Sequence, residues 1–244
     1  MKILVLRRPK ITFIISFVIL AISLTYVLWL GVVPSLEPIP TNFIDQTQEK
    51  VVVLTFDDGP DPAYTGPILD ILKKKQVGAT FFVLGECVEA NPDLLRRMLK
   101  EGHEIGNHGY THDYSQRYSQ SKTLDEIRRT DKAVYAATGI HTYFYRPPGG
   151  FTLKSQTEII NRNGYEVILW SADSRDWRKP GVNRIKKNVL SNVFPGAIVL
   201  FHDGGGMRSQ TVKALEQVID QLRVNGYRFV TLRELFHLDS KPRT

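Results

Sequence analysis

Two hydrophobic patterns divide this 244-residue chain. Residues 11–33 form one run without a formal charge, whereas from Lys50 onward short apolar runs alternate with longer amphipathic stretches. Several short runs, such as VVVLTF and AIVLF, are almost continuously apolar, which is typical of strands buried on both faces of a parallel sheet. Seven such runs predict strands, at Val51–Phe56, Ala79–Leu84, His103–Asn107, Thr142–Arg146, Glu166–Ser171, Ala197–Phe201 and Tyr227–Thr231.

The amphipathic stretches between these runs predict helices. Asn91 and Pro92 are residue types typical of an N-cap and a first helical turn, and another apolar face extends from Val212 to Leu222. Glycine, which ends helices in a left-handed conformation, precedes several strands, at Gly78, Gly102, Gly139, Gly164 and Gly226. This alternation predicts an α/β fold, either a barrel-like domain with about seven parallel strands or an open doubly wound sheet. The absence of GxGxxG and P-loop patterns argues against nucleotide binding.

The first apolar run predicts a membrane anchor. As a helix, Ile11–Val33 would extend about 34 Å, enough for a hydrocarbon core of about 30 Å. The basic tip at residues 1–10 favours a cytoplasmic N-terminus, so we expect a single-pass protein of the cell membrane with an extracytoplasmic domain. Secretion after signal cleavage is the alternative, although no A-x-A site follows the run. Residues 34–49, with three prolines, predict a linker.

Composition narrows the function of the domain beyond the linker. The hydrophobic content of 42% and the charged content of 23% of the whole chain are those of a globular protein. The single cysteine, Cys87, excludes an internal disulfide framework and cysteine-based zinc sites, so a metal would have to bind His, Asp or Glu. Of the 32 basic residues, four lie in the first ten positions, and no basic cluster follows that would indicate nucleic-acid binding.

Ionisable residues follow five of the seven predicted strands. They occur in the segments DDG at 57–59, NHGYTH at 107–112, RPPGG at 146–150, DSRDW at 173–177 and HDG at 202–204. Each segment alone reads more simply as a turn, a cap or a strand end. In an α/β barrel, however, the carboxyl ends of the strands meet on one rim where active sites lie. We therefore expect the five segments to converge on one site.

One aspartate and two histidines on this rim predict a metal site. Three such ligands leave a fourth position open for water, as in a catalytic zinc site. We predict Asp58, His108 and His112 as the ligands. Asp57 would then act as the base that takes a proton from the water on the ion. Arg146 would keep the Asp57 carboxylate ionised and oriented.

The remaining rim residues predict an acid and an acyl pocket. His202 would protonate the leaving group, with Asp176 keeping its imidazole charged and aligned. The backbone N–H of Gly149 would face a developing oxyanion. Trp177 and Leu200 would line a pocket for an acyl methyl group. The predicted reaction is metal-assisted hydrolysis of an amide or ester.

The five segments, read in order, resemble the motifs of the polysaccharide deacetylases, which are carbohydrate esterase family four, the nodulation-factor deacetylase homology domain. The resemblance rests on TFDDGP at 55–60, the His-x-x-x-His at 108–112, RPPGG at 146–150, Asp-Trp at 176–177 and Leu-x-His at 200–202, and covers residues 50–236. It implies a distorted (β/α) barrel, Zn²⁺ or sometimes Co²⁺ or another divalent ion on Asp58, His108 and His112, and removal of N-acetyl or O-acetyl groups. It also implies the same roles for the other rim residues.

One position departs from the family pattern, and a second varies within the family. The family usually has Ser or Thr after the first ligand histidine, and its hydroxyl braces the loop. Here that residue is Gly109, and a hydroxyl follows only at Thr111, so we expect metal binding that is retained but weaker. At Gly149 some members carry an aromatic residue, but the backbone N–H is unaffected by that change.

The predicted location points to the substrate. An anchored extracytoplasmic domain reaches the cell-wall polysaccharide, and we expect N-acetylglucosamine of peptidoglycan first and N-acetylmuramic acid second. An esterase of O-acetylated polysaccharide and a wall-binding protein with a relict site are the alternatives. We expect a monomer that binds no nucleic acid, with a C-terminal tail at residues 237–244.

Overall fold

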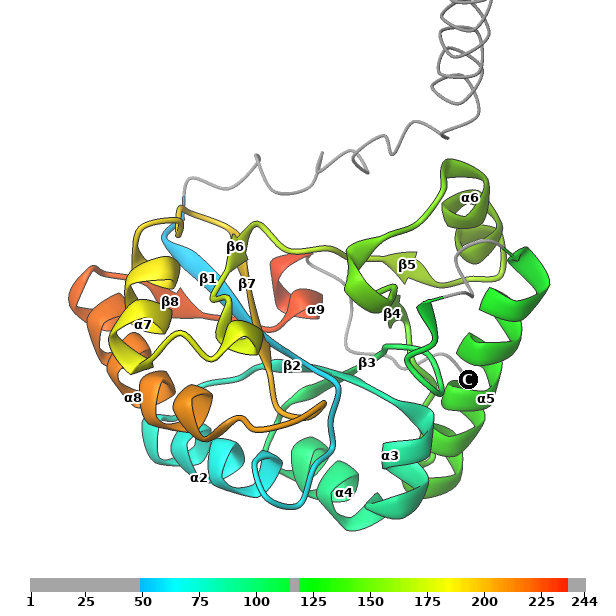
Figure 1. Cartoon of the computed structure of the whole chain (residues 1–244), viewed down its shortest axis with the longest axis horizontal. Coiled ribbons are helices and arrows are strands. Elements are labelled where there is room, and N and C mark those ends of the chain that lie inside the picture. Colours follow the sequence, from blue (N-terminus) through cyan, green and yellow to red (C-terminus); the bar gives the residue numbers. More distant parts are fainter. Residues whose placement is uncertain (1–48, 115–118, 237–244) are drawn as a thin grey trace, which may run out of the picture. The chain divides into compact units, whose positions relative to one another are not determined.

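The computed structural model describes residues 49–114 and 119–236 (Figure 1). The predicted tip, the anchor at 11–33, the linker up to residue 48 and the tail at 237–244 lie outside these ranges. Within the described ranges, no helix is both long and apolar enough to cross a bilayer.

Parallel strands and helices alternate along the described chain. The strands are β1 (Val51–Asp57), β2 (Thr80–Val83), β3 (Glu104–Asn107), β4 (Phe144–Tyr145), β5 (Glu166–Val167), β6 (Ala172–Asp173), β7 (Ala197–His202) and β8 (Arg228–Phe229). The α-helices are α2 (Thr65–Lys75), α3 (Gly85–Ala90), α4 (Pro92–Lys100), α5 (Gln120–Thr138), α6 (Lys154–Arg162), α7 (Val182–Leu190), α8 (Ser209–Val224) and α9 (Leu232–Leu235). Two short 3₁₀ turns are η2 (Pro148–Gly150) and η3 (Asp176–Arg178).

The strands form one curled parallel sheet. Its order is β5-β4-β3-β2-β1-β7-β6, and β8 pairs with the beginning of β1. Helices such as α2, α4 and α8 lie outside the strands, as in Figure 1. The barrel-like α/β fold predicted from the sequence is therefore confirmed, and each of the seven predicted strands overlaps an observed one.

One predicted strand is divided between the two edges of the sheet. The run at 166–171 was expected to form one continuous strand. Only its first two residues, which form β5, pair with β4, and the chain then leaves that edge of the sheet. Ile168 still donates to the Tyr145 carbonyl at 2.9 Å, whereas Ser171 donates to the Ile198 carbonyl of β7 at 3.0 Å. Residues 168–171, here called the crossing segment, therefore bridge the two edges, which makes the barrel distorted.

Alternating side chains of the strands build an outer and an inner apolar cluster, and a smaller third cluster packs around Tyr145 and Val167. An outer cluster, which includes Phe56, Phe81 and Phe201, packs under the helices. An inner cluster fills the inside of the curled sheet with Val51, Val53, Phe82, Phe144, Ile168, Ile198, Val230 and Leu232. Because side chains alternate along a strand, Thr55 and Asp57 follow Val51 and Val53 on the inner face of β1. The inside of the barrel thus changes from apolar to polar toward the carboxyl ends of the strands.

Three helix ends show which boundaries the sequence pattern predicted and which it did not. Helix α4 begins at Pro92 with Asn91 as its N-cap residue, as predicted, but the Asn91 side chain makes no capping bond. Helix α2 does not end at a left-handed Gly78; Gln76 takes that conformation instead, with a φ of 51°. Helix α5 does end on the expected left-handed glycine, Gly139.

Candidate active site

The predicted rim residues meet at the carboxyl ends of the strands. Asp57 ends β1 and His202 ends β7, while His108 and Arg146 directly follow β3 and β4. Asp176 lies in η3, shortly after β6. The parallel register brings these ends together, because every strand of the sheet runs in the same direction.

Asp58, His108 and His112 form a group with the spacing of a metal site. One ligand atom from each residue lies within 4.8 Å of the others. Oδ1 of Asp58 lies 3.4 Å from Nε2 of His108 and 3.3 Å from Nε2 of His112. This oxygen is buried and has no hydrogen-bond partner. Because buried polar atoms are normally paired, a bound cation would account for it. One carboxylate and two imidazoles suit zinc and similar divalent ions.

The backbone conformation and a hydrogen bond to a neighbouring carbonyl orient these three side chains. Asp58 and His112 have positive φ angles of 75° and 60°, a strained conformation for residues with side chains. Nδ1 of His108 lies 2.7 Å from the Arg146 carbonyl. That bond places the proton on Nδ1 and leaves Nε2 free to bind a metal.

Electrostatics favour the metal-binding forms of two of these residues. Burial would raise the pKa of Asp58, but the neighbouring histidines outweigh it and hold this pKa well below its ordinary value. Burial and then the charge of His108 lower the pKa of His112. Asp58 is therefore a carboxylate, and His112 favours the neutral imidazole that metals require.

Asp57 and Arg146 form a buried ion pair beside the metal group. Nη1 of Arg146 donates to Oδ1 of Asp57 and to Oγ1 of Thr55, each at 2.8 Å. The arginine also donates to the carbonyls of Ile168 and Leu169 in the crossing segment, at 3.2 and 3.1 Å. Oδ2 of Asp57, the oxygen not bound by Arg146, lies 3.7 Å from Nε2 of His108, toward the metal group.

His202 and Asp176 form a second linked pair. Nδ1 of His202 lies 2.7 Å from Oδ1 of Asp176. Oδ2 of Asp176 accepts from the His202 backbone N–H at 2.9 Å and from the Thr211 hydroxyl at 2.8 Å. Burial alone would lower the pKa of His202, but the hydrogen bond and charge of Asp176 raise it to about 9. His202 is therefore cationic near neutral pH and has a proton to give.

The residues predicted to line the acyl pocket differ in exposure. Leu200 is buried in β7, two residues before His202 and on the same face of the strand. Trp177 is 45% exposed next to Asp176. Gly149 has a φ of 67°, and a side chain there would come within 2.8 Å of the Tyr114 ring. Tyr114, which meets the His112 ring edge-on at 4.9 Å, occupies the space that an aromatic residue at 149 would need.

Two buried residues of the site were given no role from the sequence: Arg208, which the sequence did not place there, and Asp203, which lies in the predicted HDG segment. Arg208 donates to the Gly204 and Gly205 carbonyls at 2.7 and 3.1 Å, and its Nη2 lies 3.9 Å from Oδ2 of Asp58. Asp203 accepts from the Thr65 hydroxyl at 2.5 Å, and burial raises its pKa to about 7. The run of glycines after His202 was the available signal for a tightly packed loop, but nothing in the sequence pointed to Arg208.

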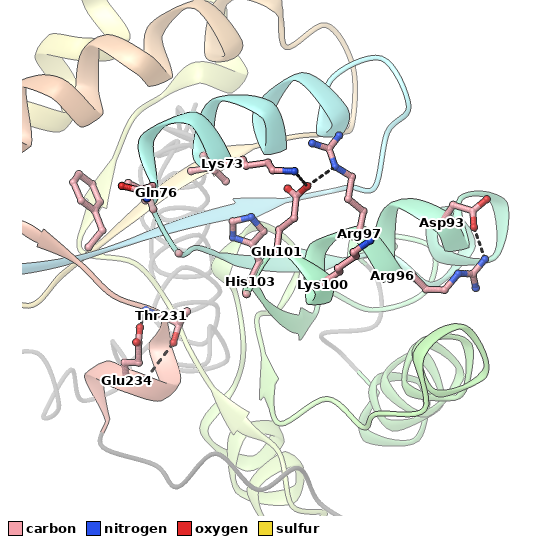
Figure 2. Close-up of a pocket in the computed structure, with 15 residues that line it drawn as sticks. Lys73, Gln76, Asp93, Arg96, Arg97, Lys100, Glu101, His103, Thr231 and Glu234 are labelled. Atoms are coloured by element: carbon pink, nitrogen blue, oxygen red, sulfur yellow. Dashed lines mark hydrogen bonds and ion pairs between the residues drawn. The ribbon is translucent and has the colours of Figure 1, made fainter.

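A cavity of about 1240 Å³ lies away from these residues, at the amino ends of β2 and β3. Figure 2 shows His103 and Glu101 near its centre, with Lys73 and Arg97 directed toward Glu101. Neither ring nitrogen of His103 has a hydrogen-bond partner, and burial lowers its pKa to about 4. Lys73 and Arg97 both pair with Glu101, at 3.5 and 3.1 Å, and Arg96 pairs with Asp93. Three of the four cations that line this cavity are thus matched by carboxylates, so no charged ligand is implied.

The sequence model of the family described as polysaccharide deacetylase matches residues 44–168. This chain belongs to the polysaccharide deacetylase family. It is 43% identical over 201 residues to a peptidoglycan-N-acetylglucosamine deacetylase of Bacillus cereus, a match that covers 80% of this chain and 94% of that protein. A chitooligosaccharide deacetylase of Bradyrhizobium is 38% identical over 206 residues, with the same coverage.

A solved structure supports the same assignment for this polysaccharide deacetylase. The crystal structure of the Bc1960 peptidoglycan N-acetylglucosamine deacetylase, in complex with 4-naphthalen-1-yl-N-oxidanyl-benzamide, superimposes with a TM-score of 0.76. The two proteins are 38% identical, and the match covers 80% of this chain and 91% of the other. Both the fold and the type of enzyme are therefore those of a polysaccharide deacetylase.

Proposed function

We propose that this chain is a metal-dependent N-deacetylase of cell-wall amino sugars, with N-acetylglucosamine of peptidoglycan as its substrate. Two of its relatives, described above, bear the name of a deacetylase of that sugar in peptidoglycan. The Bradyrhizobium relative is named for chitooligosaccharides, which makes these the natural comparison substrate.

The buried, unpartnered Oδ1 of Asp58 between two histidine Nε2 atoms carries the metal dependence. Asp58, His108 and His112 would hold the ion, for which we propose Zn²⁺, with Co²⁺ as a functional substitute. A divalent cation bound there would polarise the acetyl carbonyl and lower the pKa of a water molecule.

Asp57 would take the proton from the attacking water. Its Oδ1 is held by Arg146, so Oδ2 is the oxygen available for proton transfer. The guanidinium keeps the carboxylate in one orientation and compensates its charge in a buried environment. Arg146 is thus a positioning residue, and Asp57 is the proposed base.

His202 would give its proton to the amine that leaves. Asp176 holds the imidazole through Nδ1, which leaves Nε2 as the donor. We further propose that the backbone N–H of Gly149 stabilises the oxyanion and that Trp177 and Leu200 contact the acetyl methyl. A free amine on the sugar and acetate would be the products.

We also propose that residues 11–33 anchor the enzyme in the cell membrane, with the domain at 50–236 outside the cytoplasm and acting as a monomer. The support is the charge-free run and its basic flank in the sequence.

Acetate release by the full chain tests the proposed function. Peptidoglycan, chitin oligomers and O-acetylated xylan would be compared with Zn²⁺, with Co²⁺ and with a chelator, and an Asp57→Asn variant would report background. We expect chelator-sensitive release that is fastest from peptidoglycan, with the new amines on N-acetylglucosamine residues. Release only from xylan would replace the proposal with an O-acetyl esterase, and release that survives the chelator would refute the metal dependence.

A further inference from the structure

We propose that Glu126 on helix α5 is a positioning residue that holds His112 in place to bind the metal ion. The inference rests on the proposed function for the identity of the metal site. It concerns the loop from His108 to His112, here called the metal loop, which carries both histidine ligands.

The Glu126 carboxylate is fixed to the middle of the metal loop. Its Oε2 accepts from the backbone N–H of Tyr110 at 2.9 Å, from the backbone N–H of Thr111 at 2.8 Å and from the Thr111 hydroxyl at 3.1 Å. Glu126 is only 4% exposed, although it belongs to a largely polar helix. Burying a carboxylate is costly, so its three donors indicate a specific structural role.

These contacts replace the brace that the sequence lacks at Gly109. Gly109 has no hydroxyl, and its φ of 84° lies in the left-handed region. Its N–H is bound instead by the Asn107 side chain at 2.9 Å, which fixes the beginning of the loop. At the other end, the Glu126 contacts hold the two residues that precede His112, whose φ of 60° is strained. The Glu86 backbone N–H also donates to the Tyr110 carbonyl at 3.2 Å, and the Tyr114 ring meets the His112 ring edge-on. The weaker, looser loop expected from Gly109 is therefore compensated from α5.

The same helix provides a matched control. Asp131, one turn and a half further along α5, accepts from the backbone N–H and the hydroxyl of Thr142 at 2.7 and 2.8 Å. Its second oxygen lies 2.7 Å from Nδ1 of His141. Both carboxylates thus anchor a loop through a threonine, but the loop held by Asp131 carries no proposed metal ligand.

Metal affinity of the full-length chain, measured without substrate, tests this role. Zn²⁺ affinity would be determined by competition with a chromophoric chelator for wild type, Glu126→Gln, Glu126→Ala and Asp131→Asn. Thermal unfolding of the metal-free proteins would report stability, and the visible spectrum of bound Co²⁺ would report ligand geometry. We expect Glu126→Gln to weaken Zn²⁺ binding about 10- to 100-fold, as loss of outer-shell partners of metal ligands does, and to change the Co²⁺ spectrum.

Asp131→Asn should lower the unfolding temperature but leave affinity within about twofold of wild type, with an unchanged Co²⁺ spectrum. If Glu126→Ala fails to fold, Glu126→Gln carries the test. Wild-type affinity and an unchanged spectrum in both Glu126 variants that fold would overturn the role, as would an equal loss of affinity in Asp131→Asn. Because no substrate is used, this result is independent of whether the wild-type chain releases acetate from peptidoglycan.

Discussion

Asp57 and His202 are register partners at the ends of the adjacent parallel strands β1 and β7. Each is held by its own charged neighbour, Asp57 by Arg146 and His202 by Asp176. The next residue in the chain, Asp58, belongs to the metal group with His108 and His112. The proposed proton acceptor and the proposed proton donor thus lie next to each other on two adjacent strands, an arrangement that suits hydrolysis of an amide.

Asp57→Asn should abolish turnover while leaving metal stoichiometry unchanged. The amide cannot act as a base, and Asp57 is not in the metal group. The buried guanidinium of Arg146 would also lose its counterion, so we expect unfolding to become easier by about 3 kcal/mol. Metal analysis, acetate release and denaturant unfolding measure the three effects. Turnover at the wild-type rate would remove Asp57 as the base.

The acid limb of the mechanism predicts a pH dependence. His202 must be protonated to act, and its pKa of about 9 means that activity should fall as pH rises through that value. Asp176→Asn removes the charge that raises this pKa and leaves burial, which lowers it, so the falling limb should move to lower pH. The profile of kcat/KM against pH measures the shift.

Two further variants complete this test. Thr211→Val, which keeps the contact between Asp176 and His202, should shift the limb less. His202→Ala should lower kcat by about 10²- to 10⁴-fold with metal retained, as loss of a general acid does. If the alkaline fall of kcat/KM occurs at the same pH in Asp176→Asn as in wild type, His202 is not the acid.

The same pair contributes to stability with a defined sign. The pKa of His202 is raised on folding, so its contribution is complete below the ordinary histidine value of 6.5 and is lost as pH rises through about 9. Unfolding free energies of wild type and His202→Ala should therefore converge at alkaline pH.

His112→Ala should strip the metal from the protein. Its Nε2 is one of the three proposed ligand atoms, and two protein ligands hold zinc poorly. Metal content after gel filtration measures the loss, with His141→Ala, an exposed histidine paired with Asp131, as the control. Equal metal content in the two variants would exclude His112 from the ligand set.

Gly109→Ser should retain metal binding but destabilise the fold. Serine would restore the hydroxyl typical of the family, yet a side chain at a φ of 84° costs about 1–2 kcal/mol. Because Asn107 and Glu126 already hold the metal loop, the added hydroxyl should not improve Zn²⁺ affinity. Affinity measured by competition and thermal unfolding would check both statements, and tighter binding would show that the loop is underbraced.

The parts of the fold visible in the sequence were those set by local burial. Continuous apolar runs gave the positions of the strands, because strands covered on both faces require such residues. The division of residues 166–173 between two sheet edges was not visible, since residues 167–170 form one uninterrupted apolar run and the break depends on the closure of the barrel. Gln76 in place of a glycine at the end of α2 was equally hidden.

For the site, too, only residues placed by their position next to a strand could be identified from the sequence. Side chains that immediately follow a strand, such as Asp58 and His108, were identified because the ends of parallel strands share one rim. Glu126 and Arg208 were missed because they come from helix α5 and from the residue before α8, and only packing brings them to the rim. The sequence showed that Gly109 lacks the hydroxyl typical of the family. The proposed replacement for that contact, Glu126, lies 17 residues further along the chain.

Arg146 contacts the crossing segment and the carboxylate of Asp57 with one guanidinium. Without residues 168 and 169 in their crossing position, the guanidinium would lose two of the four acceptors that hold it, and the proposed base would lose part of its orientation. Variants that disturb the crossing segment should therefore lower hydrolytic activity even though they touch no residue that contacts substrate. One buried side chain thus links the closure of the fold to the proposed chemistry.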